Sequence, residues 1–158
     1  MKFLGLSVEM RDILITGLTT LDLIFKMENF PNKNEKYRAD TAMLSGGGNA
    51  GNASVAVARL GANSTIFSAV GNDEVGSFIL AKLQRENVNT EFVLTLEKWQ
   101  SSFSSVLVDN NGERQIVNYR NSLPEGAVKS ILDFPIYDAY LSDSRWHEAA
   151  IATLSLAK

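Results

Sequence analysis

Alternation of apolar strands with helices constrains the fold of this 158-residue sequence more than any other feature. Residues 50–60 and 74–86 place small or apolar side chains at helical spacing, and the run 64–70 between them is typical of a buried strand. Further buried strands are expected at 12–17 and 139–142. Because a strand, a crossover helix and a second strand place the two strands parallel, we predict an α/β fold with a mostly parallel sheet.

Four extended segments do not fit inside such a sheet, because one of their faces is polar. Residues 21–27 and 36–43 form one pair, and in the second of these the side chains alternate between polar and apolar. Residues 103–108 and 114–119 form another pair, joined by an Asn-Gly turn that is a strong hairpin signal. We predict that they build a small antiparallel lid. The lid would cover about 21–44 and 101–120.

Residues 1–11 are interpreted as a lead-in to a single α/β domain over 12–158. Within that domain we also predict a strand near 90–94 and a short helix around 125–132. A last helix is predicted over 146–157, and it contains no stop signal before the sequence ends. We therefore expect the domain to be truncated within this helix.

Composition excludes several classes of function. Lysine and arginine number 15 against 18 aspartate and glutamate, so the net charge of −3 argues against a nucleic-acid partner. With no cysteine and one histidine, a disulfide framework is excluded and a metal site made by protein ligands alone is disfavoured. No apolar run reaches the roughly 20 residues of a membrane-spanning helix. We expect a cytoplasmic protein that binds neither a membrane nor a nucleic acid.

The turn at 46–51 matches the pattern G-x-G-x-x-G of dinucleotide-binding proteins. That pattern belongs directly after the first buried strand, whereas here a half-polar segment precedes it. The acidic partner it would need, Asp73, is better placed as the N-cap of the helix that follows. We therefore disfavour a dinucleotide site.

The residues of the same turn favour a sugar as the ligand. Gly47 and Gly48 allow close backbone approach at a helix start, and Asn49 and Asn52 supply amide groups that both donate and accept. The alternative is a tight turn with a capping asparagine, but two asparagines exceed what capping needs. Asp22 follows the first buried strand, where ligands of α/β sheets bind, and its carboxylate would accept hydrogen bonds from two hydroxyls. Its alternative is a solvated loop aspartate.

Four stretches carry a resemblance to a known family: GLTTLD at 17–22, GGNAGNAS at 47–54, ARLGA at 58–62 and VGNDEVG at 70–76. Together they resemble the PfkB (ribokinase-like) carbohydrate kinases. The resemblance implies a doubly wound ribokinase-like sheet with a β lid, truncated before the C-terminal nucleotide-binding half.

The resemblance also implies an activity, which is ATP-dependent transfer of a phosphoryl group to a sugar hydroxyl with Mg²⁺ bridging the phosphates. In this family the catalytic aspartate lies in a Gly-Ala-Gly-Asp motif of the C-terminal half, and this sequence contains no such motif. The chain would then supply the lid and the sugar pocket and would be inactive by itself. Lid sheets of the family often pair between subunits, so a homodimer through the lid is expected.

Two branches of the family are similar to this chain. Its glycine turn resembles that of ketohexokinase, and its segments after residue 100 resemble sulfofructose kinase. The second resemblance implies that Lys36, Asn118 and Arg145 hold a sulfonate, although each could be an ordinary exposed residue. Because Asn49 and Asn52 depart from the sulfofructose kinase pattern, the sugar stays open between ketoses such as sulfofructose and fructose, phosphorylated at C1.

Two other readings remain open. The chain could be a sugar-binding or interaction module without catalysis, or an inactive truncated product. A nucleotide-dependent oxidoreductase is a more remote third possibility. ATP consumption in the presence of ketoses separates kinase from binding module, and a dinucleotide titration tests the third.

Overall fold

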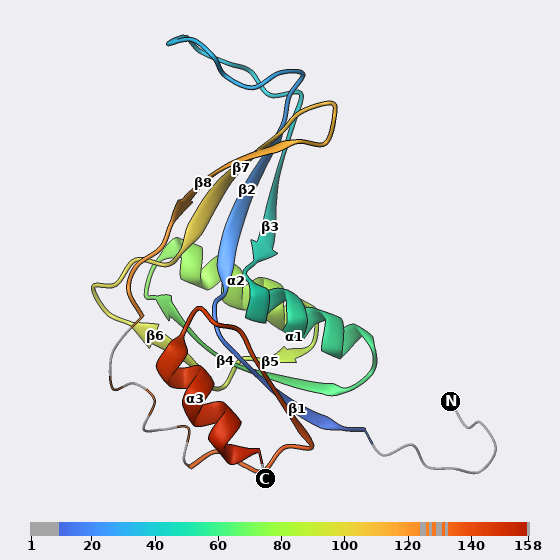
Figure 1. The fold of residues 1–158 in the computed structure, drawn as a ribbon, viewed down its shortest axis with the longest axis vertical. Coiled ribbons are helices and arrows are strands. Elements are labelled where there is room, and N and C mark those ends of the chain that lie inside the picture. The colour runs from blue at the N-terminus through green and yellow to red at the C-terminus, as the bar shows by residue number, and fades with distance from the viewer. Residues whose placement is uncertain (1–9, 124–125, 127, 129–130, 132, 158) are drawn as a thin grey trace, which may run out of the picture.

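The computed structural model describes residues 10–123, 126, 128, 131 and 133–157. A parallel sheet forms the body of the molecule, with the strand order β5-β4-β1-β9 and β6 paired to a further stretch of β4 (Figure 1). Every pairing in this sheet is parallel, as predicted. Its strands are β1 (Asp12–Thr16), β4 (Asn63–Gly71), β5 (Val88–Asn89), β6 (Val93–Leu96) and β9 (Ala139–Ser142).

Helices cover both faces of this sheet: α1 (Asn49–Arg59) and α2 (Glu74–Arg85) on one face and α3 (His147–Leu156) on the other (Figure 1). Neighbouring side chains of β1 and β4 point to opposite faces and so enter different cores. Ile15 and Ile66 pack under α1 and α2, whereas Leu14 and Phe67 pack under α3. The Phe67 ring stacks on Trp146 with centroids 4.9 Å apart. The doubly wound architecture is therefore confirmed.

A second sheet projects from the body as the lid, with the order β3-β2-β7-β8 (Figure 1). Its strands are β2 (Thr20–Lys26), β3 (Thr41–Gly47), β7 (Phe103–Val108) and β8 (Arg114–Tyr119). The expected antiparallel lid is wrong at its centre, because β2 and β7 pair in parallel and only the two outer pairs are antiparallel. Both central strands follow strands of the parallel sheet, so both leave its carboxyl edge in the same direction.

The predicted strand over 36–43 lies too early in the chain. Strand β3 runs from Thr41 to Gly47, and the loop 27–40 forms the far tip of the lid (Figure 1). The Tyr37 hydroxyl accepts hydrogen bonds from the amides of Asn32 and Lys33, which folds this loop on itself. The side-chain alternation was therefore a misleading strand signal.

Other predictions have mixed outcomes. The predicted strand at 90–94 is two short strands, β5 and β6, separated by a turn, while the hairpin and the strand at 139–142 have the expected bounds. The helix predicted around 125–132 lies largely outside the described residues, as does most of the 1–11 lead-in. In the part of the chain that is described, no helix is both long and apolar enough to cross a membrane.

Candidate functional site

A cavity of about 670 Å³ lies between the lid and the carboxyl edge of the parallel sheet. Residues from both sheets line it: the loop after β1, the start of α1, the loop after β9, and three lid strands. Six predicted residues meet at this cavity: Asp22, Gly48, Asn49, Asn52, Asn118 and Arg145. The structure thus gathers residues that are up to 123 positions apart in the sequence.

The glycine turn packs directly on the loop after β1. Gly48 has φ +82°, and a Cβ atom there would overlap the Leu18 carbonyl oxygen. A Cβ atom on Gly47 would overlap the carboxylate of Asp22. Glycine is therefore required at both positions, by backbone conformation at Gly48 and by close packing at both. Gly47 itself is buried and faces a separate cavity of about 560 Å³ between β3, α1 and α2.

Asn49 and Asn52 do not serve as helix caps. Helix α1 has Gly48 at its N-cap and no capping bond from a side chain. Neither asparagine side chain hydrogen-bonds to another residue that the structure describes, and both are exposed at the cavity. The turn therefore presents two unengaged amide groups, which removes the capping alternative.

Asp22 lies on lid strand β2 and is only partly exposed, so it is not a solvated loop residue. Its Oδ1 accepts a hydrogen bond of 3.1 Å from the Thr20 hydroxyl. Across the lid, Asp22 pairs with Ser104 on β7, which pairs with Asn118 on β8. Because paired residues share a face of a sheet, these three polar side chains form one row above the cavity.

The next row of the lid is apolar. Ile24, Val106 and Ile116 are paired across β2, β7 and β8, two residues farther from the body. Val106 and Ile116 line the cavity beside the polar row. In the polar row, the Asn118 amide donates to the Ser104 hydroxyl at 3.1 Å, which leaves its Oδ1 as an acceptor. The lid face of the cavity thus offers hydrogen-bonding groups beside an apolar patch. This combination suits the hydroxyls and C–H groups of a sugar.

Two arginines line the cavity, and only Arg145 was predicted from the sequence. Arg145 lies in the loop between β9 and α3, and Arg120 directly follows β8. Neither forms an ion pair with a described acidic residue. Arg120 comes two residues after Asn118, so the period of two in strand β8 was the signal that could have identified it.

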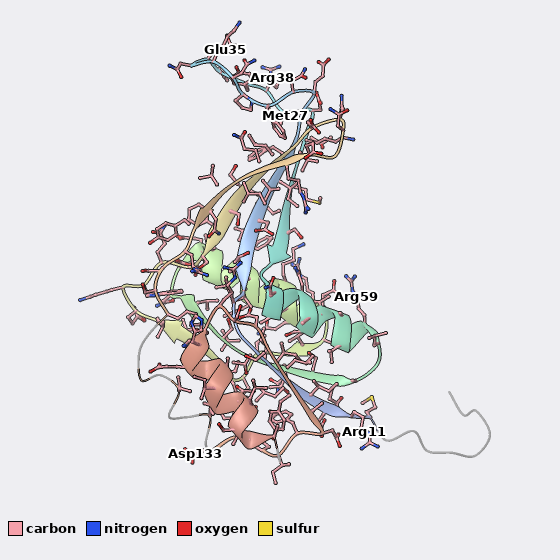
Figure 2. The ribbon with its side chains drawn as sticks, viewed as in Figure 1. Arg11, Met27, Glu35, Arg38, Arg59 and Asp133 are labelled. Carbon is pink, nitrogen blue, oxygen red and sulfur yellow. The ribbon has the colours of Figure 1, made fainter. Side chains whose placement is uncertain are left out.

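Lys36 is not at this cavity. It lies in the loop at the tip of the lid, between Glu35 and Arg38 in the sequence, and both of these residues lie at the end of the lid far from the body (Figure 2). The expectation that it would lie on a lid strand fails because β3 starts only at Thr41. Of the three residues that the resemblance implied together, Asn118 and Arg145 line the cavity and Lys36 does not, and Arg120 is a further lining arginine.

Asp73 has the capping role predicted for it. Its Oδ1 accepts the Gly76 amide at 2.7 Å and the Ser101 hydroxyl at 2.7 Å, and its Oδ2 accepts the Ser101 amide at 2.8 Å. Burial alone would raise the pKa of Asp73, but the hydrogen bonds from Ser101 and Gly76 outweigh burial and hold this pKa below its ordinary value. Both carboxylate oxygens of Asp73 therefore take part in holding the start of α2 and Ser101.

In the part of the chain that the structure describes, no group of three histidine, aspartate or glutamate side chains is placed to hold a metal ion. Mg²⁺ is usually held by one or two carboxylates together with substrate phosphates, so a site made by protein ligands alone is not what the resemblance requires.

Comparison with known proteins identifies the family. Residues 10–130 match the model of the pfkB family carbohydrate kinases. A ribokinase from Dictyostelium discoideum is 28% identical over 106 residues, covering 67% of this chain and 33% of the relative. The ketohexokinase of Mus musculus is 28% identical over 123 residues, covering 77% of this chain and 41% of the enzyme.

A solved structure of a similar protein has the same fold. The fold matches that of an Agrobacterium tumefaciens protein assigned as a ribokinase with a TM-score of 0.88 and 29% identity, over 94% of this chain and 49% of the other. The chain spans between a third and a half of the length of these relatives. A family match over most of the sequence, joined to this fold, shows that the chain belongs to the pfkB family of carbohydrate kinases.

Proposed function

We propose that this chain forms the lid and the sugar pocket of a kinase that transfers a phosphoryl group from ATP, with Mg²⁺, to a sugar hydroxyl. The observation that carries the proposal is the meeting of Asp22, Asn49, Asn52 and Asn118 at one cavity under the lid. Each asparagine amide both donates and accepts, and the ionised carboxylate accepts from two hydroxyls. This is the set of partners that a polyhydroxylated ligand requires.

We infer that these 158 residues do not catalyse the transfer by themselves, because the Gly-Ala-Gly-Asp motif in which the resemblance places the base is not in this sequence. The purified chain, mixed with ATP, Mg²⁺ and fructose or sulfofructose, is expected to show no turnover, whereas the natural protein at full length phosphorylates its sugar. Turnover by the 158-residue chain, with a heat-inactivated control, would contradict this placement of the base.

The substrate that we propose is a ketose phosphorylated at C1, with sulfofructose ahead of fructose. A sulfonate is ionised at neutral pH and needs cationic donors, and an arginine fork matches its paired oxygens. Arg145, Arg120 and Asn118 all line the cavity and are the residues proposed to bind this group.

Sugar selectivity tests the anion proposal. In the full-length natural protein, Arg145→Ala is expected to weaken sulfofructose binding by roughly a hundredfold while changing fructose binding little, since a charge-assisted bidentate contact is lost. Lys36→Ala is the matched control, because it removes a cation at the lid tip and should change neither affinity. Equal loss of both sugars in Arg145→Ala would contradict the proposal, as would loss of sulfofructose in Lys36→Ala.

A second function would use the same cavity, because the residues that line it could bind a sugar whether or not a phosphoryl group is transferred. A sugar-binding module without catalysis would show the same features. It predicts that the full-length natural protein binds the sugar without consuming ATP, whereas the kinase proposal predicts consumption that depends on the sugar.

We also propose that the lid pairs with a second copy of the chain. Met43 and Val117 are 60% and 72% exposed and lie on opposite faces of the lid sheet, so apolar surface is open on both faces. Light scattering of the natural protein is expected to give a dimer that Val117→Glu weakens. An unchanged dimer in that variant, or a monomeric natural protein, would contradict it.

A further inference from the structure

Two aspartates bracket strand β9, one directly before it and one directly after it. Asp138 precedes the strand at the amino edge of the parallel sheet, and Asp143 follows it at the carboxyl edge beneath the lid. Each donates its own amide to β1: Asp138 to the Asp12 carbonyl at 2.8 Å and Asp143 to the Thr16 carbonyl at 3.0 Å. The Oδ2 atom of each aspartate also accepts a backbone N–H: Asp138 from Asp12 of β1, and Asp143 from Leu18 in the loop after β1. The two residues thus close the same strand pair at opposite ends.

The two carboxylates differ in what they position. Oδ2 of Asp143 accepts the Leu18 amide at 2.9 Å, and Oδ1 accepts the Arg145 amide at 2.8 Å. Leu18 and Arg145 both line the cavity, on loops that come from two different strands. Asp138 instead holds the Asp12 amide and the Arg11 guanidinium, and Arg11 lies at the end of the molecule opposite the lid (Figure 2).

The chain leaves room for the Asp143 carboxylate by having glycine opposite it. Gly17 has φ +145°, and a Cβ atom there would overlap the carboxyl group of Asp143. Leu18 in turn supplies the carbonyl oxygen against which Gly48 packs. One carboxylate is therefore linked to the Arg145 loop directly, and through Leu18 to the glycine turn.

We propose that Asp143 is a positioning residue that sets the distance between the Arg145 loop and the glycine turn at the cavity. This inference rests on the proposed function, since the ligand concerned is the proposed sugar. Asp143 does not line the cavity, so it acts through the backbone of Leu18 and of Arg145. A shift of about 1 Å between two such binding elements is enough to cost a large factor in affinity or rate.

Two variants of the full-length natural protein test Asp143, and a third serves as control. Asp143→Asn turns an amide group toward one of the two N–H donors, and Gly17→Ala displaces the carboxylate without removing it. Both are expected to raise the Kd for sulfofructose by roughly tenfold or more. Asp138→Asn is the matched control, because it disturbs the same strand pair far from the cavity and should leave the Kd unchanged.

A double-mutant cycle separates positioning from a merely structural role. If Asp143 acts through Arg145, then Asp143→Asn adds little to the loss of sulfofructose affinity in Arg145→Ala, and the two effects are non-additive. Additive effects, or the same Kd in Asp143→Asn as in Asp138→Asn, would overturn the inference while leaving the proposed function intact. Absence of sugar binding by the unsubstituted protein would overturn the proposed function and this inference with it.

Discussion

The two sheets of this molecule are stabilised in different ways. In the body, eight of the nine residues of β4 are buried, and helices cover both faces of the sheet. In the lid, every residue of β8 is exposed, and its position depends on strand pairing and on a few polar contacts such as the one between Asn118 and Ser104. The body therefore provides most of the stability, while the lid contributes side chains to the cavity that stability does not require.

The sharpest test of this contrast is one large truncation in each sheet. Phe67→Ala in β4 removes a fully buried ring that stacks on Trp146, and it should lower the free energy of unfolding by about 3–5 kcal/mol. Arg114→Ala in β8 removes an exposed side chain that does not line the cavity, and it should change it by less than about 0.5 kcal/mol. Urea unfolding of the natural protein measures both, and similar losses would contradict the division of roles.

Substitution of two glycines tests how tightly the turn at the junction of the two sheets is packed. Gly48 and Gly61 both have positive φ, but a Cβ atom on Gly48 overlaps the Leu18 carbonyl oxygen, whereas one on Gly61 meets nothing within 4 Å. Gly48→Ala should cost about 2–3 kcal/mol, and Gly61→Ala about 1 kcal/mol from backbone strain alone. Chemical denaturation compares them. Equal costs would show that the turn does not pack as tightly on the loop after β1 as the structure has it.

The smallest expected effect is a dependence of the unfolding free energy on pH. It arises at Asp73, which holds the segment before strand β7 through hydrogen bonds from Ser101. The pKa of Asp73 in the folded state lies below its ordinary value, because hydrogen bonds from Ser101 and Gly76 outweigh the effect of burial. Its stabilisation is therefore present above about pH 4 and is lost as the pH falls through the folded-state pKa.

The corresponding variant is Asp73→Asn, whose deficit in unfolding free energy should shrink as the pH falls from 7 toward 3. Ser101→Ala removes one of the donors and should show the same trend with a smaller amplitude. A deficit that stays constant over this range would mean that the ionised carboxylate does not contribute in this way.

The sequence predicted correctly those strands that are covered by helices on both faces. The buried strands and the helices that cover them follow from apolar periodicity, and the β7–β8 hairpin follows from its Asn-Gly turn. It failed where strands are exposed, because alternation over 36–43 is compatible with a loop as well as with a strand. The parallel pairing of β2 with β7 depends on where both strands leave the body, which no local pattern records.

The candidate site shows the same division. The sequence predicted Asp22 and the glycine turn because a carboxylate after a buried strand and amides at a helix start lie where ligands of α/β sheets bind. Lys36 was expected from resemblance alone, and the start of β3 at Thr41 places it at the lid tip. Arg120 was missed although it continues the register of Asn118, because the strand signal ends at Tyr119.

The most direct test of the central claim is a calorimetric titration of the full-length natural protein and its Asp22→Asn variant with sulfofructose and fructose. Asp22 faces the cavity from the lid, and its variant keeps the shape of the side chain while removing its charge. We predict that the natural protein binds at least one of the two sugars and that Asp22→Asn weakens this binding by about tenfold to a hundredfold with little change in Tm. Equal affinity in the two proteins would contradict the claim that the lid carboxylate and the glycine turn hold a sugar between them.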